Sequence, residues 1–303
     1  MRQVRHFAKK VLRLLPEPVF QAIRRFYYVR VVRSVSEASE ADLEIVRYLV
    51  NPGNRAVDVG ANIGVYTKHL SNLVGDSGRV YAIEPLPLTF DLLRANVRAL
   101  ALRNVELMNC AVSSKNGQVT MAVPVIAGEE NFYRARIVQE WRANSHRVEV
   151  ESRTLDTLFA GQPYPIAFIK CDVEGHELDC IRGGADLVRR YHPAWLIEIT
   201  GDPDDPTSTA HAVFHMLLAE SYEAYWFDGV ALNKRKQGDK SVNYFGSLGI
   251  SVVLATYGGD SLDFRQNRPR IWGLPRRFPE NHYFFLGGRL LQMLNDRGVR
   301  VRQ

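Results

Sequence analysis

Short apolar runs of strand length alternate along the chain with longer stretches whose apolar residues recur at helical spacing. Seven runs predict the strands of one central sheet, at residues 55–59, 79–83, 105–112, 166–172, 195–199, 222–227 and 283–286. The intervening segments with helical spacing are 40–49, 66–74, 87–100, 174–190 and 208–220. Strands that alternate with helices along a chain form a doubly wound, mostly parallel sheet that is covered by helices on both faces. The pattern therefore predicts an α/β fold.

Two further segments interrupt this alternation. Residues 119–125 and 147–151 alternate in the manner of strands, and we expect them to pair as an added hairpin that flanks the main sheet. Residues 232–280 contain a basic run and a later apolar block without a clear period, so they are predicted as an inserted loop or small lid.

The first 35 residues form a basic extension, and residues 36–303 form the main domain. Helical spacing of the apolar residues predicts one or two amphipathic helices, broken at Pro16 and Pro18. One interpretation is a segment that lies on anionic lipid head groups at a membrane surface. The alternative is a helical cap that packs on the main domain and keeps its charges in water, while contact with nucleic acid ranks third. The basic residues are Arg2, Arg5, Lys9, Lys10, Arg13, Arg24, Arg25, Arg30 and Arg33.

Composition adds a limited amount to this picture. With 303 residues, 46% of them hydrophobic, and a net charge of +6, the chain can bury one large core or two small ones. Cys110, Cys171 and Cys180 are too few for a disulfide framework, which favours a reducing compartment. No stretch has the length and apolar character of a membrane span, and the N-terminus lacks the pattern of a signal peptide. We therefore expect a cytoplasmic protein, and the lipid-surface interpretation of its basic extension would place it at the inner face of the membrane.

The first two predicted strands end at residues that suit a nucleoside cofactor. Asp58 lies in the first strand and is followed by Gly60 and Gly64, which allow the backbone to approach a ligand closely. Glu84 ends the second strand, about 20 residues beyond the glycines, where a carboxylate can bind the two hydroxyls of a ribose. This arrangement suits both NAD and S-adenosylmethionine. A glycine-rich turn without a ligand remains the structural alternative.

The glycine spacing favours S-adenosylmethionine over a dinucleotide. A dinucleotide fingerprint places glycines where this chain has Asn62 and Val65, so two of the glycines that let the backbone bind a pyrophosphate are absent. The side-chain amide of Asn62 can instead hydrogen-bond the carboxylate or the amine of a methionine group. An NAD-dependent oxidoreductase or epimerase remains the runner-up hypothesis.

The fourth and fifth predicted strands place further acids on the same edge of the sheet. Asp172 ends the fourth strand and is followed by Glu174, His176 and Glu177, while Glu198 lies near the end of the fifth. Ligands of open α/β sheets bind at the carboxyl ends of the strands, so Asp172, Glu174, His176 and Glu198 are candidate catalytic groups. Helix capping is the alternative for Asp172 and Glu174, and it is favoured for Glu177. Oxygen ligands for Mg²⁺ are present, but no metal site is predicted.

Three ordered motifs carry a resemblance to a known family. They are DVGANIGVYT at residues 58–67, AIEPLP at 82–87 and IKCDVEGHE at 169–177, and together they resemble the FkbM-type S-adenosylmethionine-dependent methyltransferases. The resemblance covers roughly residues 40–200 and, weakly, the segment 281–286. It implies a class I methyltransferase fold, Rossmann-like, with seven strands of which the last is antiparallel. The cysteine at position 171 replaces a residue that is more often aliphatic in the family.

The same resemblance implies roles for individual residues. Asp58, Gly60, Asn62 and Gly64 would line the methionine and ribose part of the cofactor, and Glu84 would accept hydrogen bonds from the ribose hydroxyls. Beside the adenine ring we expect Cys110 and Ala111, for which plain core packing is an equal alternative, and Asp172 is expected at the edge shared by cofactor and acceptor. The implied reaction is O-methylation of a sugar, a lipid-linked glycan or a small metabolite. A binding module that merely retains the fold, on a membrane surface or nucleic acid, is a further alternative.

Overall fold

The computed structural model gives the arrangement of most of the chain. It describes residues 15–36, 42–126, 129–130, 132, 135–138, 145–199, 201–227, 230–239, 282–286, 294 and 296–302. Most of the predicted insertion at 232–280 and the first 14 residues of the basic extension lie outside these described residues.

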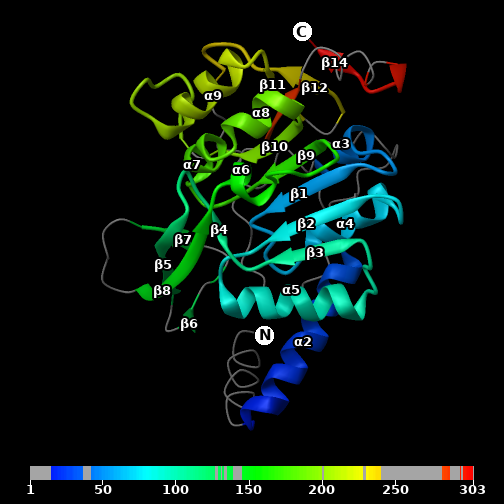
Figure 1. Cartoon of the computed structure of the whole chain (residues 1–303), viewed down its shortest axis with the longest axis vertical. Coiled ribbons are helices and arrows are strands. Elements are labelled where there is room, and N and C mark those ends of the chain that lie inside the picture. The colour runs from blue at the N-terminus through cyan, green and yellow to red at the C-terminus, as the bar shows by residue number, and fades with distance from the viewer. Residues whose placement is uncertain are drawn as a thin grey trace, which may run out of the picture.

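Five parallel strands form one half of the central sheet (Figure 1). Their order across the sheet is β10-β9-β1-β2-β3. The central strands β1, β9 and β10 follow apolar runs and are almost fully buried, because a strand covered by helices on both faces exposes neither face to water, whereas the edge strand β3 is partly exposed. Their bounds are β1 (Arg55–Val59), β2 (Arg79–Ile83), β3 (Val105–Met108), β9 (Ile166–Cys171) and β10 (Ala194–Glu198).

The other half of the sheet contains antiparallel pairs. β13 lies antiparallel between β10 and β11, and β12 and β14 complete a sheet of nine strands. The predicted fold class and the antiparallel last core strand are confirmed. The predicted count of seven strands is not: five strands are parallel neighbours, and the described part of the sheet has nine strands in all. The bounds are β11 (Glu223–Phe227), β12 (Leu232–Lys234), β13 (His282–Leu286) and β14 (Val301–Arg302). Because β12 belongs to the sheet, the predicted insertion does not begin at residue 232.

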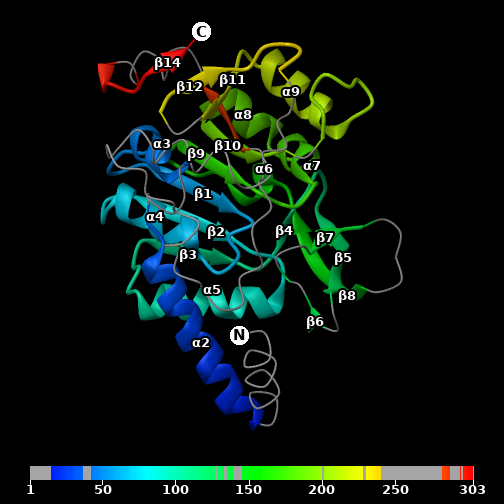
Figure 2. The ribbon, with the colours of Figure 1, turned by 180° about the vertical axis from the view of Figure 1, so that it is seen from behind.

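Helices cover both faces of this sheet (Figures 1 and 2). Val57, Ile169 and Trp195 point into the cluster formed with the helices of one face, whereas Ala56 and Phe168 point into the opposite cluster. The period of two along each strand therefore builds both cores from one set of strands. One face carries α6 (Leu155–Leu158), α7 (Glu177–Arg182), α8 (Ala185–Tyr191) and α9 (Thr209–Ala219), and the other carries α3 (Asp42–Leu49), α4 (Val65–Val74) and α5 (Pro87–Ala99).

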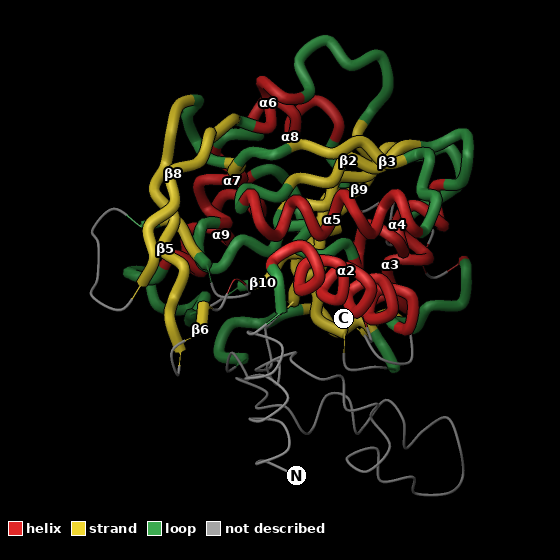
Figure 3. Tube along the Cα trace, turned by 90° about the horizontal axis from the view of Figure 1, so that it is seen from below, coloured by secondary structure: helices red, strands yellow, loops and turns green. Residues whose placement is uncertain are grey.

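A second, smaller sheet flanks the first, as predicted. β5 (Gly117–Ile126) and β8 (Ser145–Arg153) form its antiparallel hairpin, which extends away from the main sheet in Figure 3. Three short strands join them: β4 (Ala111–Val112), β6 (Glu129–Glu130) and β7 (Arg136–Ile137).

Two predicted elements are divided in the structure. The run 105–112 was expected as one strand, but β3 ends at Met108, and β4 pairs instead with β8 of the small sheet. The segment 174–190 was expected as one helix, but it divides between α7 and α8 at Gly183 and Gly184. A Cβ atom at Gly183 would lie 2.1 Å from the carbonyl oxygen of Ser113, so close backbone packing requires glycine there.

The described part of the basic extension is a single helix, α2 (Glu17–Ser34), that projects beyond the main body next to α5 (Figures 1 and 3). Pro18 lies in the first turn of this helix and Pro16 directly precedes it, so the helix begins at the predicted position of the break, and the segment before residue 15 lies outside the described residues. At its other end Val31 and Val32 are buried. Val19, Ile23 and Phe26 remain 44%, 42% and 64% exposed. The last turns of α2 thus cap the main domain, and its first turns do not.

Candidate functional site

The loop after β1 is shaped by two glycines. Gly60 has φ +73°, and a Cβ atom there would lie 1.9 Å from the carbonyl oxygen of Asp172. Gly64 has φ +92° and precedes α4, and a Cβ atom there would lie 2.8 Å from Leu93 Cδ1. Both glycines are therefore required by packing of the loop on the end of β9 and on α5, in addition to the positive φ that glycine tolerates.

Glu84 joins the end of β2 to this glycine loop. Its Oε2 atom accepts a 3.0 Å hydrogen bond from the backbone N–H of Asn62, and its Oε1 atom accepts one of 3.0 Å from the N–H of Leu86. The residue is only 6% exposed, and this burial raises the pKa of Glu84 to about 7 against the two hydrogen bonds, which lower it. Asn62 has φ +50° and contributes its backbone N–H here, where the sequence drew attention to its side chain.

Asn109 supports the same acid from the neighbouring strand, and the sequence analysis did not single it out. Its side-chain amide donates to the carbonyl oxygens of Glu84, at 2.8 Å, and Pro85, at 3.0 Å. The next two residues are Cys110, which precedes β4 and is 5% exposed, and Ala111, which begins β4 and is 3% exposed. Their position agrees with both interpretations, a contact to a bound ring and plain core packing.

Asp58 is fully buried beneath the glycine loop. Its Oδ2 atom accepts a 2.5 Å hydrogen bond from the hydroxyl of Thr67 on α4, and its Oδ1 atom lies 3.7 Å from the Nζ atom of Lys170. Burial raises the pKa of this carboxyl group, while Lys170 and Thr67 act in the opposite direction. With 0% exposure, Asp58 links β1 to the first turn of α4 through Thr67 in this structure.

Lys170 is the central residue that sequence analysis missed. Its Nζ atom lies 3.0 Å from Asp172 Oδ2, donates to the carbonyl oxygen of Gly60 at 3.1 Å, and lies 5.3 Å from the ring centroid of Tyr66. The residue is 3% exposed. A signal was present in the sequence, because a lysine inside the apolar run 166–171 is costly to bury unless it is paired. The structure thereby brings together Asp58, Gly60 and Asp172.

The turn after β9 holds the next group of predicted residues. Glu174 has φ +55° and Gly175 has φ +96°, so the chain reverses sharply before α7. Glu177 is 4% exposed, and its Oε1 atom accepts hydrogen bonds from the backbone N–H groups of Gly175, at 2.9 Å, and Val173, at 3.4 Å. Glu177 therefore stabilises the turn, in agreement with the capping interpretation.

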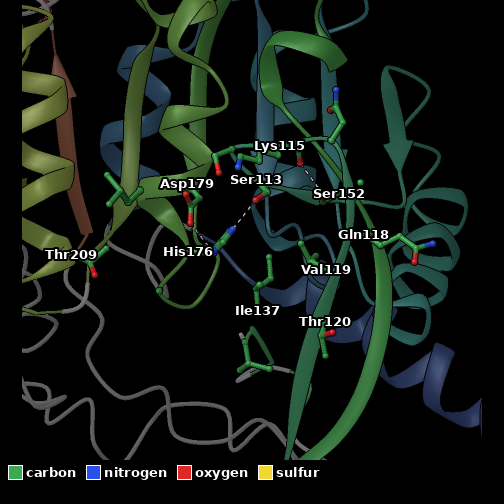
Figure 4. Close-up of a pocket in the computed structure, with 16 residues that line it drawn as sticks. Ser113, Lys115, Gln118, Val119, Thr120, Ile137, Ser152, His176, Asp179 and Thr209 are labelled. Atoms are coloured by element: carbon green, nitrogen blue, oxygen red, sulfur yellow. Dashed lines mark hydrogen bonds and ion pairs between the residues drawn. The ribbon is translucent and has the colours of Figure 1, made fainter. Parts of the chain in front are cut away.

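His176 stands at the N-cap position of α7 and faces a different element. Its Nε2 atom lies 3.0 Å from the hydroxyl oxygen of Ser113, and its Nδ1 atom lies 3.6 Å from Asp179 Oδ2 (Figure 4). Burial lowers the pKa of His176, while Asp179 acts to raise it. Burial therefore favours the neutral form of the imidazole ring. Ser113 is a further residue that the sequence did not identify.

A cavity of about 750 Å³ opens beside His176, between α7 and the small sheet (Figure 4). His176 lines this cavity, whereas Asp172, Glu174 and Glu198 are not among its lining residues. Glu198 is 5% exposed at the end of β10. The structure therefore divides the predicted catalytic residues between the edge of the main sheet and the cavity.

The described part of the chain lacks two kinds of feature. No group of three or more His, Cys, Asp or Glu side chains is arranged to hold a metal ion. No helix combines the length and apolar character that crossing a membrane requires. Cys110, Cys171 and Cys180 are all buried with free thiols.

Comparison with known proteins identifies a family. A family model for the methyltransferase FkbM domain matches residues 58–224. Methyltransferase 1 of Beauveria bassiana is 25% identical over 146 residues, which cover 42% of this chain and 57% of that protein. The hexuronic acid methyltransferase AglP of Haloferax volcanii is 29% identical over 160 residues, which cover 50% of this chain and 58% of that protein. The chain thus spans a little over half the length of these two curated relatives.

Solved structures include one protein of the same description. The FkbM methyltransferase from Methylobacillus flagellatus KT shares 15% sequence identity with a TM-score of 0.39, and the alignment covers 67% of this chain and 55% of that chain. The matched family region spans the glycine loop, Glu84, the turn after β9 and the hairpin.

Proposed function

The chain belongs to the FkbM methyltransferase family, and from that membership we propose that it transfers the methyl group of S-adenosylmethionine to a hydroxyl group of a sugar, a lipid-linked glycan or a small metabolite. The observation that carries the proposal is the hydrogen bond between Glu84 Oε2 and the backbone N–H of Asn62. It fixes a buried carboxylate against the glycine loop at the carboxyl ends of β1 and β2, the edge where open α/β sheets bind ligands.

The residues at this edge fit the methyl donor that the family uses. An adenosine group presents a ribose diol, and a carboxylate at the end of the second strand accepts hydrogen bonds from two hydroxyls. Glu84 has the required chemistry, and its two backbone hydrogen bonds fix its orientation. The missing dinucleotide glycines, at Asn62 and Val65, count against NAD. S-adenosylmethionine is the cofactor of a chain in this family, and the alternative of a dinucleotide oxidoreductase receives no support.

When bound, S-adenosylmethionine supplies a methyl group that is activated by a positively charged sulfur. The protein has to orient the acceptor oxygen in line with that group and to exclude water, because alignment lowers the barrier of a displacement. The ion pair between Lys170 and Asp172 fixes the end of β9 relative to the glycine loop. Asp172 is thus proposed to position the reacting groups at this edge.

A hydroxyl acceptor also needs a group that takes its proton. Neutral imidazole is suited to this at neutral pH. His176 lines the cavity next to the sheet edge, and burial lowers its pKa and so favours the neutral ring, which supports it over Glu174 and Glu198 as the base. The carboxylates of Asp172 and Glu177 are already engaged, with Lys170 and with the turn before α7.

The name of one relative suggests two kinds of methyl acceptor. The name of the Haloferax relative refers to a hexuronic acid, which offers both hydroxyl groups and a carboxylate as methyl acceptors. A methyl ether survives mild alkali, whereas a methyl ester is hydrolysed. Treating the methylated product with dilute base therefore distinguishes the two outcomes, and retention of the label supports O-methylation at a hydroxyl.

Titration calorimetry with S-adenosylhomocysteine tests the foundation of this proposal. We expect one binding site in the wild-type protein and a strong loss of affinity in Glu84→Ala. Glu106→Ala is a matched control, because Glu106 is an acid on the neighbouring strand β3 with a side chain that is 48% exposed. Absence of binding in the wild type, or equal binding in both variants, would contradict the assignment of the cofactor.

We also propose that α2 contacts an anionic membrane surface. Val19, Ile23 and Phe26 are exposed apolar residues at helical spacing, and the helix carries Arg24 and Arg25 among them. Apolar side chains with flanking arginines bind the interface of anionic lipid bilayers. The burial of Val31 and Val32 favours a cap at the other end, so the two interpretations apply to different halves of one helix.

A further inference from the structure

The cavity beside His176 is bounded by two separate parts of the fold. One wall comes from the segment 113–120, which leads into and includes the start of β5, and the other comes from the turn after β9 and from α7. Its volume of about 750 Å³ lies within the range of small-molecule sites. The added hairpin, which is not part of the central sheet, therefore creates a space next to the catalytic edge.

Side chains that both donate and accept hydrogen bonds form part of the cavity lining, beside apolar residues such as Val119, Ile137 and Leu178. Hydroxyl and amide side chains have this double capacity, and so do the hydroxyls of a saccharide. Among the described lining residues none is aromatic, whereas sites for nucleic-acid bases typically stack them on aromatic rings. The polar residues include Ser113, Asn116, Gln118, Thr120, Ser152 and Thr209.

A smaller cavity lies next to this one, toward the edge of the main sheet. Its volume is about 160 Å³, and it shares Gly175 and Thr209 with the larger one. It is also lined by Glu177 and Ile199, and Ile199 directly follows the last residue of β10. This smaller, mostly apolar cavity thus lies between the larger one and the carboxyl end of β10, the edge of the sheet where the methyl donor is expected.

Ser113 and His176 form a contact at the wall of this cavity. Ser113 is 7% exposed and lines the cavity, and its hydroxyl oxygen lies 3.0 Å from His176 Nε2. Asp179 Oδ2 lies 3.6 Å from Nδ1 on the other side of the ring (Figure 4). A carboxylate beside Nδ1 favours the tautomer with its proton on that nitrogen, so that Nε2 can accept a proton from Ser113.

We propose that this cavity binds the acceptor as a saccharide and that Ser113 and His176 together take the proton of the hydroxyl that becomes methylated. The inference rests on the proposed methyltransferase function and deepens it. The acceptor O–H bond breaks, its proton passes to the Ser113 oxygen, and the Ser113 proton passes to His176 Nε2. The acceptor oxygen forms a bond to the methyl carbon, the bond between that carbon and sulfur breaks, and its electron pair stays on sulfur.

The test uses the full chain, radiolabelled S-adenosylmethionine and four probes: the p-nitrophenyl glycosides of glucose, mannose, rhamnose and glucuronic acid. Binding of each probe to the protein saturated with S-adenosylhomocysteine is measured by saturation-transfer NMR, and label transfer gives kcat and KM. We expect His176→Gln and Ser113→Ala each to lower kcat, the former by about 100-fold, with little change in KM. We expect the double variant to be no slower than His176→Gln, because residues that act as a unit are not additive.

His215→Gln is the matched control, since His215 is exposed on α9 and outside the cavity; its kcat should equal that of the wild type. Affinity for S-adenosylhomocysteine should be unchanged in all variants, which separates this inference from the proposed function. Absence of S-adenosylhomocysteine binding in the wild type would refute the proposed methyltransferase function. Cofactor binding without binding of any glycoside, or a kcat within twofold of wild type in either single variant, would overturn the inference alone.

Discussion

The ammonium nitrogen of Lys170 lies 3.0 Å from the Oδ2 atom of Asp172, two residues further along the chain. Both side chains are on the same side of β9 and its extension, because side chains alternate along a strand. The same nitrogen lies 3.7 Å from Asp58 Oδ1 and donates to the carbonyl oxygen of Gly60. One buried cation thereby holds the first strand, the glycine loop and the end of the fourth parallel strand in a fixed arrangement.

Replacement of this lysine should destabilise the fold. Lys170→Met keeps the apolar stem but leaves Asp58 and Asp172 without their cation, and removal of one partner of a buried ion pair typically costs about 3 kcal/mol or more. Urea denaturation measures this loss. Lys115→Met is the control, since Lys115 is exposed, and it should change the free energy of unfolding by less than about 0.5 kcal/mol. Equal stability of the two variants would show that the buried pair contributes nothing.

Gly60 should tolerate substitution less well than a glycine of the same conformation elsewhere. Gly60 and Gly161 have φ +73° and +72°, but a Cβ atom at Gly161 meets nothing within 4 Å, whereas at Gly60 it lies 1.9 Å from Asp172 O. Gly161→Ala should cost about 1–2 kcal/mol through backbone strain alone. Gly60→Ala should cost clearly more and should weaken binding of S-adenosylhomocysteine, measured by thermal unfolding and calorimetry. A matching loss of stability in both variants would argue against the close packing.

The hydroxyl of Thr67 should matter more than its shape. Thr67→Val removes the donor to Asp58 Oδ2 and leaves a buried carboxylate oxygen without that hydrogen bond, at a cost of about 1–3 kcal/mol. Thr67→Ser keeps the hydroxyl and should lose less stability. Chemical denaturation of both variants tests the order, and a more stable valine variant would contradict it.

Glu84 should make stability depend on pH in a defined window. Burial raises the pKa of Glu84 to about 7 in the folded protein from the ordinary value of 4.5 in the unfolded chain, so between these pH values the folded state binds more protons than the unfolded state. Stability is therefore highest below pH 4.5 as far as this group is concerned, and it falls as the pH rises through 7. Relative to Glu84→Gln, the wild type should lose about 3 kcal/mol across the window. Parallel stability curves of the two proteins between pH 5 and 8 would disprove the raised pKa.

The ionisation of Glu84 should also affect the cofactor. A charged carboxylate accepts stronger hydrogen bonds from ribose hydroxyls than a neutral carboxyl group does. Affinity for S-adenosylhomocysteine should therefore rise as the pH increases from 6 to 8, with release of a proton on binding. Calorimetry in buffers of different ionisation enthalpy measures that proton, and no difference between buffers would contradict the prediction.

The exposed start of α2 should bind anionic vesicles. Phe26→Asp removes the most exposed of its apolar residues, and we expect it to weaken sedimentation with vesicles of phosphatidylglycerol and phosphatidylcholine, but not cofactor binding. Tyr164→Asp is the control, because Tyr164 is 54% exposed and does not belong to the helix. If the two variants sediment alike, α2 packs on the main domain and does not bind the vesicles.

Local pattern was sufficient for the strands and for the position of the acids. The strands β1, β2, β9 and β10 agree with their predicted bounds to within a residue, and α4 and α5 do so as well, because periods of 2 and 3.6 are set by residues close in sequence. The division of 105–112 between two sheets could not be predicted, since it depends on pairing of β4 with the distant strand β8. The start of α2 coincides with Pro16 and Pro18, because a proline is tolerated in the first turn of a helix but not in its interior.

The sequence by itself determined the α/β class, the glycine loop and the acid at the end of the second strand, since each follows from the local alternation of apolar and polar residues. Only the tertiary structure decided which charges meet. A register shift between Arg55 and Ala56 places Asp58 directly opposite Lys170 in the pairing of β1 with β9. A slip of one residue would turn the lysine to the other face of the sheet. Sequence patterns do not encode this pairing register, because the two segments are far apart in the chain: Lys170 and Gly60 are separated by 110 residues.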